Sequence, residues 1–287
     1  MLKQRIITAL ALLAALTLTT TQLAPFYFAI VVGTLLLLAA VEWSNFIDLG
    51  SFKSKLGYLL SLVVLLSGTF LMLGITPSSK SLEQDRVLTI LLLGVLFWLL
   101  MFLLLRHYPE NQGSWNNKSK IALMGVFVLI PAWVGLVQLK YLLDSGLLVL
   151  ALILLTSSVD IGAYFAGVSF GNSKLAPHIS PKKSWEGVWG GTLLCLVVSI
   201  FLIWTLNNSI LALSVVQITL LVLLSFLVSI GSVVGDLFES MLKRNKNLKD
   251  SGKLLPGHGG LLDRTDSLMA VTPFFVLVLM FVLDGAL

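Results

Sequence analysis

The 287-residue sequence has little charge and almost no cysteine. Asp, Glu, Lys and Arg make up only 11% of it, whereas a soluble globular protein uses about 25%. The one cysteine, Cys195, lies in an apolar run without a partner, which excludes a disulfide framework and a paired-cysteine zinc site. A Walker-type lysine loop and a Gly-x-Ser-x-Gly elbow are also absent. Apolar residues account for 57% of the chain, a composition that indicates a polytopic membrane protein.

Nine segments are long and apolar enough to cross a bilayer as helices, because a hydrocarbon core about 30 Å thick needs roughly 20 residues. We expect an all-α bundle that forms a single membrane domain over 1–287, with hydrophobic helices in 1–145 and the polar motifs in 146–287. The first span is expected to be retained, since no small-residue cleavage site follows it. The predicted spans are approximately 6–22, 25–43, 56–76, 87–106, 121–139, 146–168, 187–206, 209–235 and 268–285.

Basic residues are distributed unevenly between the loops of this arrangement. With nine spans, 16 of the 19 Lys and Arg residues fall on one side, and the loop 236–267 alone holds six. Basic loops tend to stay in the cytoplasm, so we expect a cytoplasmic N-terminus and a cytoplasmic loop 236–267. The net charge of +5 therefore reflects topology, and no nucleic-acid partner is expected.

Residues 236–266 form a charged island between two long apolar segments. On a continuing helix, Asp236, Ser240 and Lys243 share one face. There Asp236 can coordinate a cation and Ser240 can donate to a phosphate oxygen, while Lys243 or Arg244 neutralises charge one turn further on. This mixture suits a divalent metal and phosphate. It comprises five carboxylates and six cations: Asp236, Glu239, Asp250, Asp263, Asp266, Lys243, Arg244, Lys246, Lys249, Lys253 and Arg264.

The segment Pro256-Gly-His-Gly-Gly260 interrupts helix within the island. Proline and glycine break a helix, and the glycines permit close approach of the backbone to a ligand. His258 can act as a base or a hydrogen-bond donor, or simply fix the loop geometry. Residues 261–266 reopen a helix and place Asp263 and Asp266 in its first turn, where phosphate and Mg²⁺ are favoured. A merely solvated, salt-bridged loop would leave the glycines and the charge density unexplained.

A polar cluster at the end of the sixth predicted span contains Asp160 and Tyr164, which share one helix face. An ionisable residue at this depth is costly unless it faces protein or water, so we expect Asp160 to face a cavity. Its small neighbours within 162–167 favour close packing of another helix.

A second cluster, Ser180–Gly187, leads into the seventh predicted span. Lys182 and Lys183 can meet phosphates, and Ser184 can act as a further hydrogen-bond partner or as a helix cap. Equally, the lysine pair can do no more than set topology and touch anionic headgroups.

Three segments of the island together resemble the signature of the phosphatidate cytidylyltransferases, also called CDP-diacylglycerol synthases. They read Ser240-Met-Leu-Lys-Arg244, Lys249-Asp-Ser-Gly252 and Pro256-Gly-His-Gly-Gly-Leu-Leu-Asp-Arg-Thr-Asp266. Both upstream clusters and Gly235–Ser240 also resemble that family, so the likeness spans roughly 156–190 and 230–267. The first half of the chain contributes only hydrophobic spans.

The resemblance implies an inner-membrane enzyme that condenses CTP with phosphatidate, among membrane lipids, to give CDP-diacylglycerol and pyrophosphate. It also implies Mg²⁺ held by Asp236 and Asp263, room for K⁺ at that site, and a homodimer. Catalysis would then rest on these two aspartates with Lys243 and Arg264, in the loop 236–267 of the catalytic helices. The implied substrate-binding residues are Asp160, Tyr164, Lys182, Lys183, Ser184, Ser240, Arg244, Lys249, His258, Gly259, Gly260 and Asp266.

Two other functions fit parts of this pattern. A CTP-dependent kinase of a polyprenyl or phytyl alcohol would also need a nucleotide and metal site. It must activate a neutral hydroxyl with a dedicated base, however, and the sequence offers no certain one. A membrane transporter could use Asp160 as an intramembrane ion site and the island as a gate. Its charges would be expected across several spans, whereas here they cluster in one loop.

Overall fold

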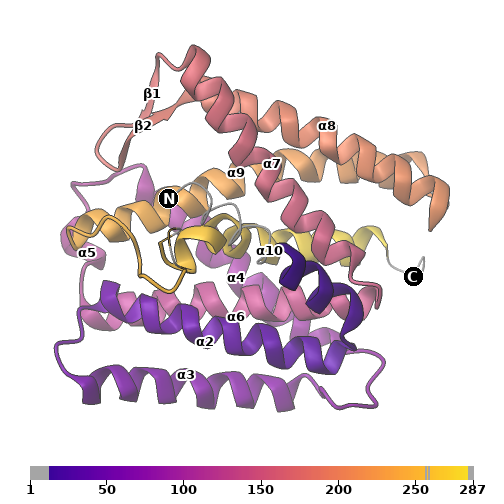
Figure 1. Cartoon of the computed structure of the whole chain (residues 1–287), viewed down its shortest axis with the longest axis horizontal. Helices are drawn as coiled ribbons and strands as arrows, with labels where there is room; N and C mark the ends of the chain where they lie inside the picture. Colours follow the sequence, from indigo (N-terminus) through magenta and orange to yellow (C-terminus); the bar gives the residue numbers. More distant parts are fainter. Residues whose placement is uncertain (1–12, 256, 258, 284–287) are drawn as a thin grey trace.

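The computed structural model describes residues 13–255, 257 and 259–283, and most of these are helical (Figure 1). Eight helices among them are long and apolar enough to cross a membrane. They are α2 (Pro25–Ile47), α3 (Phe52–Met72), α4 (Gln84–Leu105), α6 (Lys118–Leu142), α7 (Leu147–Phe170), α8 (Trp185–Ser209), α9 (Val215–Asn245) and α10 (Leu262–Val282). The expected helical membrane bundle is confirmed.

Eight of the nine predicted spans correspond to these helices, but several ends differ. The first, 6–22, lies partly outside the described residues. The eighth, 209–235, is α9, which continues into the charged island as far as Asn245. The ninth, 268–285, is α10, which begins earlier, at Leu262. Both extensions confirm the prediction that helix continues from Asp236 and begins again within 261–266. Lys243 in the first extension pairs with Asp263 in the second.

A small hairpin departs from the all-helical expectation. Strands β1 (Lys174–Ala176) and β2 (Ser180–Ser184) pair antiparallel between α7 and α8, and a short helix, α5 (Gln112–Trp115), lies between α4 and α6. The sequence pattern does not predict a strand over residues 180–184. The expected cap is present, since Ser184 Oγ accepts a hydrogen bond from Gly187 N at 3.2 Å where α8 begins.

Two buried tryptophans tie α2 to α6. Trp43 Nε1 donates to Ile121 O at 2.9 Å, and Trp133 Nε1 donates to Ala29 O at 3.0 Å. Both rings are almost inaccessible, and an indole N–H buried in this way requires such a partner. These contacts make α6 the central helix of the first half, packed against α2, α4 and α10.

Close contact between α7 and α8 depends on small residues, as expected for 162–167. A Cβ added to Gly162 would collide with the backbone at Gly190 and Gly191, and one added to Gly190 would collide with Ala166. Such small faces let two membrane helices pack backbone to backbone. The pair holds the hairpin between its ends and so fixes where β2 lies (Figure 1).

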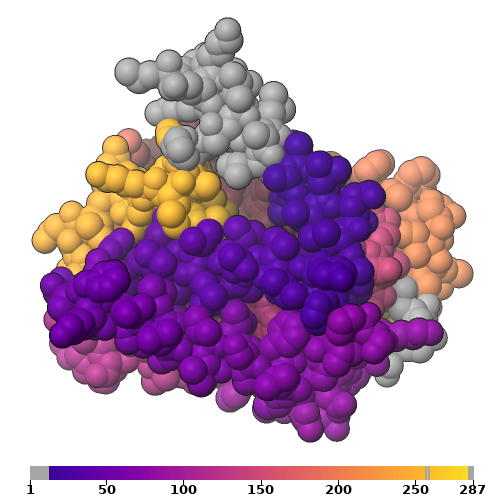
Figure 2. Space-filling view, turned by 60° about the horizontal axis from the view of Figure 1, so that its bottom comes forward, coloured from indigo at the N-terminus to yellow at the C-terminus, as the bar shows by residue number. Residues whose placement is uncertain are grey.

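Several of the basic loops meet at one end of the bundle. Asn45 Nδ2 donates to Ser251 O at 3.0 Å, which joins the end of α2 to the loop 246–261. Asn245 Nδ2 donates to Asn116 Oδ1 at 2.7 Å, which joins the end of α9 to the segment before α6. Figure 2 shows the orange and yellow segment after α9 lying beside the violet end of α2. The charged island therefore contacts the first half of the chain, at the end of α2 and at the segment before α6.

Candidate functional site

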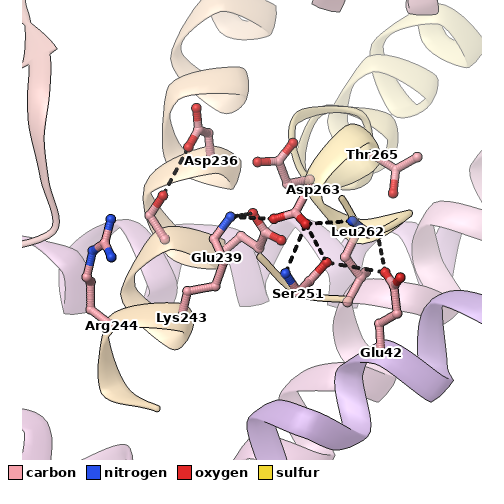
Figure 3. A network of polar contacts seen from close by, with 12 residues as sticks. Glu42, Asp236, Glu239, Lys243, Arg244, Ser251, Leu262, Asp263 and Thr265 are labelled. Atoms are coloured by element: carbon pink, nitrogen blue, oxygen red, sulfur yellow. Dashed lines mark hydrogen bonds and ion pairs between the residues drawn. The ribbon is translucent and has the colours of Figure 1, made fainter. Parts of the chain in front are cut away.

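Asp263, in the first turn of α10, is surrounded by hydrogen-bond donors (Figure 3). Its Oδ2 accepts from Ser251 N, Ser251 Oγ and Gly260 N, each at 2.9 Å. Its Oδ1 lies 2.6 Å from Lys243 Nζ. Four donors on one carboxylate fix both its position and its orientation. The loop 246–261 is folded around Asp263.

The ammonium of Lys243, on α9, bridges two carboxylates. It lies 2.6 Å from Asp263 Oδ1 and 2.6 Å from Glu239 Oε2. The three side chains are only 13%, 9% and 5% exposed for Lys243, Asp263 and Glu239. Among the described residues Glu239 Oε1 is buried without a hydrogen-bond partner. One ammonium thus holds both side chains in fixed positions.

Glu42, from α2, completes this group from the first half of the chain. It is 2% exposed, and its Oε2 accepts from Leu262 N at 2.9 Å and from Ser251 Oγ at 3.2 Å. Leu262 N is one of the unpaired amides at the start of α10, which has no side-chain cap of its own. A Cβ added to Gly252 would collide with the Glu42 carboxylate. We call Glu42, Glu239, Lys243, Ser251 and Asp263 the inner cluster.

The sequence analysis missed Glu42, because the first half seemed to contribute only apolar spans. A signal was present: Glu42 lies inside the predicted span 25–43, and a carboxylate at such a position needs a buried partner. The partner is more than 200 positions away in the chain, so only the fold identifies it.

Asp236 lies on α9 at a more open position. It forms an ion pair with Lys183 of β2, and Ser240 Oγ donates to Asp236 Oδ1 at 3.2 Å. The side chains of Asp236 and Lys183 are 33% and 26% exposed. The expected contact between Ser240 and Asp236 is confirmed, whereas Lys243, expected beside them, turns to the inner cluster. We call Asp160, Lys183, Asp236 and Ser240 the outer cluster.

Asp160 joins the outer cluster from α7. It is exposed, yet it lies within electrostatic range of Asp236, Lys183 and Arg264. Asp266, on α10, in turn lies within range of Asp236 and Asp160. The structure thus brings together the aspartates that the sequence placed in three separate motifs. Lys183 and Arg264 offset part of the repulsion at Asp160.

Tyr164 is not part of either cluster. It lies one turn beyond Asp160, is 65% exposed, and packs its ring on Phe165 with the centroids 5.5 Å apart. Sharing a helix face with Asp160 therefore does not bring it into the polar contacts of the described residues.

The other predicted substrate-binding residues surround the clusters. Arg244 Nε donates to Ile179 O at 3.3 Å, which ties α9 to the hairpin. Lys182, Lys249 and Arg264 are exposed at the same end of the bundle. Ser184, in contrast, is buried and serves as the cap of α8.

The glycine loop closes on itself just before α10. Leu255 N donates to Gly259 O at 3.0 Å, and Gly257 and Gly259 have φ values of 76° and 86°. Such angles suit glycine and strain other residues, whereas close approach of a ligand to these glycines stays a prediction. Gly260 presents its N–H to Asp263 and not to solvent. His258 lies outside the described residues.

The oxygen ligands of the two clusters fit a Mg²⁺ ion that also binds substrate. Among the described residues, no three His, Cys, Asp or Glu side chains form a complete metal site. Mg²⁺ is commonly held by one or two carboxylates together with water and substrate phosphates. Asp236 and Asp263 are each paired with a lysine, so both positions already accommodate a positive charge.

The chain is similar to known proteins over most of its length. The chain matches the cytidylyltransferase family over residues 3–282. A phosphatidate cytidylyltransferase of Haemophilus influenzae is 39% identical over 295 residues, which cover 99% of this chain and 100% of the relative. One of Pseudomonas aeruginosa is 39% identical over 280 residues, covering 97% of each chain. One of Bacillus subtilis is 37% identical over 216 residues, covering 66% of this chain and 77% of the relative. The chain belongs to the cytidylyltransferase family.

Proposed function

We propose that the chain is a phosphatidate cytidylyltransferase, which condenses CTP with phosphatidate to give CDP-diacylglycerol and pyrophosphate. The observation that carries this proposal is the meeting of the inner and outer clusters at one end of membrane-spanning helices. There a water-soluble nucleotide and a membrane lipid can reach the same carboxylates and cations. Relatives of that name match nearly the full length of the chain.

The nucleophile, phosphatidate, is already ionised before it reacts. A phosphate monoester has a second pKa of about 6, so phosphatidate is largely doubly ionised at neutral pH. One of its oxygens attacks the α-phosphorus of CTP. A new P–O bond forms while the bond from that phosphorus to the bridging oxygen breaks, and pyrophosphate leaves with the electron pair. No dedicated base is required, unlike in a kinase that acts on a neutral alcohol.

The difficulty of this reaction is electrostatic, because one anion must approach another. Fixed positive charges aimed at the reacting phosphates therefore supply most of the catalysis. Lys183 is partly exposed and paired with Asp236, so an incoming phosphate can share its ammonium. Arg264, exposed on α10 next to Asp263 in the chain, neutralises the leaving pyrophosphate in this proposal. Lys243 is held by two carboxylates and acts from a fixed position.

We further propose that the reaction depends on Mg²⁺, with Asp236 and Asp263 as its protein ligands. When bound, the ion neutralises phosphate oxygens and helps align the attacking and leaving groups. The proposal is supported by the carboxylate oxygens of these two residues, since Mg²⁺ prefers oxygen ligands. A K⁺ ion at the site, a homodimer, and an inner-membrane location with the site facing the cytoplasm stay predictions.

The direct test is a product assay with purified protein in lipid vesicles. The protein is incubated with Mg²⁺, labelled CTP and either phosphatidate or an isoprenoid alcohol, and lipids are separated by chromatography. We expect labelled CDP-diacylglycerol and an equal amount of pyrophosphate from phosphatidate alone. A phosphorylated isoprenoid would support the kinase instead, and solute flux without nucleotide turnover would support a transporter.

The Mg²⁺ proposal has its own test in the same assay. Chelation with EDTA should stop product formation, and added Mg²⁺ should restore it. Undiminished activity in EDTA would overturn the metal proposal while leaving the cytidylyltransferase proposal in place.

A further inference from the structure

An apolar cavity of about 230 Å³ lies between α7, α8, α9 and α10, and all of these except α8 carry residues of the polar site. It is lined by one face each of α7, α8, α9 and α10, and almost all of its surface is hydrocarbon. Ile203, Leu224 and Phe275 form buried walls, at 8%, 3% and 4% exposure. An apolar cavity of about 150 Å³ in another protein is large enough to bind benzene. This one can therefore take a length of hydrocarbon chain.

The cavity opens toward the lipid-facing surface. Leu147 and Leu154 line it from α7, and each is 47% exposed. A chain can enter sideways from the bilayer at this rim without crossing a polar barrier. The walls offer no charged group, so the occupant is apolar along its length.

The cavity lies about as far from the outer cluster as an acyl chain reaches from its headgroup. On α7, Leu155 is five positions and Leu147 thirteen positions from Asp160, which at 1.5 Å per residue is about 8 Å and about 20 Å. On α10, Phe275 is nine positions from Asp266, or about 14 Å. The acyl chains of one leaflet span about half of a 30 Å hydrocarbon core, or about 15 Å. A lipid whose phosphate lies at the outer cluster would place a chain in this range.

We propose that the cavity binds one acyl chain of phosphatidate and thereby determines which chain lengths the enzyme prefers. This inference rests on the proposed function, because it takes the phosphate of the same lipid to lie at the outer cluster. The glycerol lies between the two sites, along α7. Hydrocarbon buried in the cavity contributes binding energy that a short-chain lipid lacks, since each buried CH₂ favours binding.

The test fills the cavity from α7 and compares two substrates. Ala151 lines the cavity, so Ala151→Trp should occupy the space of the chain. We expect kcat/KM for dioleoyl phosphatidate to fall about tenfold, as typical for a blocked apolar subsite, while kcat/KM for dihexanoyl phosphatidate stays unchanged. Leu147→Trp at the exposed rim provides a second variant that does not disturb the buried walls.

The matched control is Val197→Trp on α8, which is 56% exposed and lies outside the lining. In this variant, the ratio of kcat/KM for dioleoyl phosphatidate to kcat/KM for dihexanoyl phosphatidate should equal that of the unaltered protein. Equal effects of Ala151→Trp and Leu147→Trp on both substrates, or no effect on either, would overturn the inference and indicate that bulk lipid fills the cavity. Failure of the unaltered protein to convert either phosphatidate would overturn the proposed function and this inference with it.

Discussion

The inner and outer clusters hold the same kinds of residues in different states. In the inner cluster, Asp263 is 9% exposed and accepts from four donors. In the outer cluster, Asp236 is 33% exposed and held by Lys183 and Ser240. Two aspartates with the same predicted role thus differ in how far the protein has already fixed them.

This difference indicates a division of labour. A carboxylate enclosed by backbone amides needs no reorganisation when a ligand arrives, which is the condition for electrostatic catalysis. A carboxylate at an open ion pair can exchange its partner at little cost, because exposed pairs contribute only about 0–1 kcal/mol. We infer that the inner cluster sets the geometry of the site and that the outer cluster admits the substrates.

The largest effect is expected from Asp263→Asn. The new side-chain amide would place an N–H group against donors that now face the Asp263 carboxylate. It would also leave Glu239 as the only carboxylate that pairs with Lys243. Breaking a buried charge pair costs about 3–5 kcal/mol, so the free energy of unfolding should fall, and kcat should drop by about a thousandfold or more, as for loss of a fixed electrostatic group. Thermal unfolding in detergent and the product assay measure the two effects.

Glu110→Gln is the matched control for this variant, because Glu110 is an exposed carboxylate at the same end of the bundle. It should change neither quantity. An Asp263→Asn protein that is fully active would remove Asp263 from the proposed metal site. One that is inactive but as stable as the unaltered protein would show that the inner cluster is not structurally fixed.

Asp236→Asn should separate activity from stability. Its ion pair with Lys183 is partly exposed, so unfolding should change by less than about 1 kcal/mol. The loss of a proposed metal ligand should still lower kcat by about a hundredfold or more, and a Mg²⁺ titration should show weaker activation. A loss of stability as large as that of Asp263→Asn would erase the distinction between the clusters.

The sequence predicted the outer cluster better than the inner one. Asp236 and Ser240 are four positions apart on one helix, so their contact follows from helical periodicity. The close packing of α7 and α8 follows from their small residues. These features depend on local pattern, which a single sequence displays. The sequence predicts Lys183 as a phosphate contact or a topology signal, and its ion pair with Asp236 is not part of that prediction.

The inner cluster depends on contacts between distant segments, which local pattern does not contain. Lys243 can pair with Glu239 by helical periodicity, but its pairing with Asp263 is decided by where α10 packs. Glu42 reaches Leu262 only because α2 ends beside the loop 246–261. The hairpin was missed for a related reason: its two strands are short, and one contains Pro181, which disfavours a strand assignment.

Glu42→Gln tests whether the first half of the chain positions the site. The substitution keeps the volume but removes the charge that faces the start of α10 and Ser251. A buried hydrogen bond weakened in this way costs about 1–3 kcal/mol, and we expect kcat to fall about tenfold, as for a slightly misplaced catalytic group. KM for CTP should change little, because Glu42 does not reach the substrates. A raised KM with normal kcat would place Glu42 in binding and not in positioning.

The smallest effects are expected from the neighbouring lysines of β2, which provide a matched pair. Lys183→Gln removes the ammonium that pairs with Asp236, and we expect KM for phosphatidate to rise about fivefold, in line with the loss of one partly screened charge contact. Lys182→Gln removes an exposed charge one position away and should change KM by less than about twofold. Raising the salt concentration should shrink the difference, because screening weakens exposed charges most. Equal effects of the two variants would mean that β2 supplies only a general positive potential, and the outer cluster would then consist of Asp160, Asp236 and Ser240 without a specific lysine.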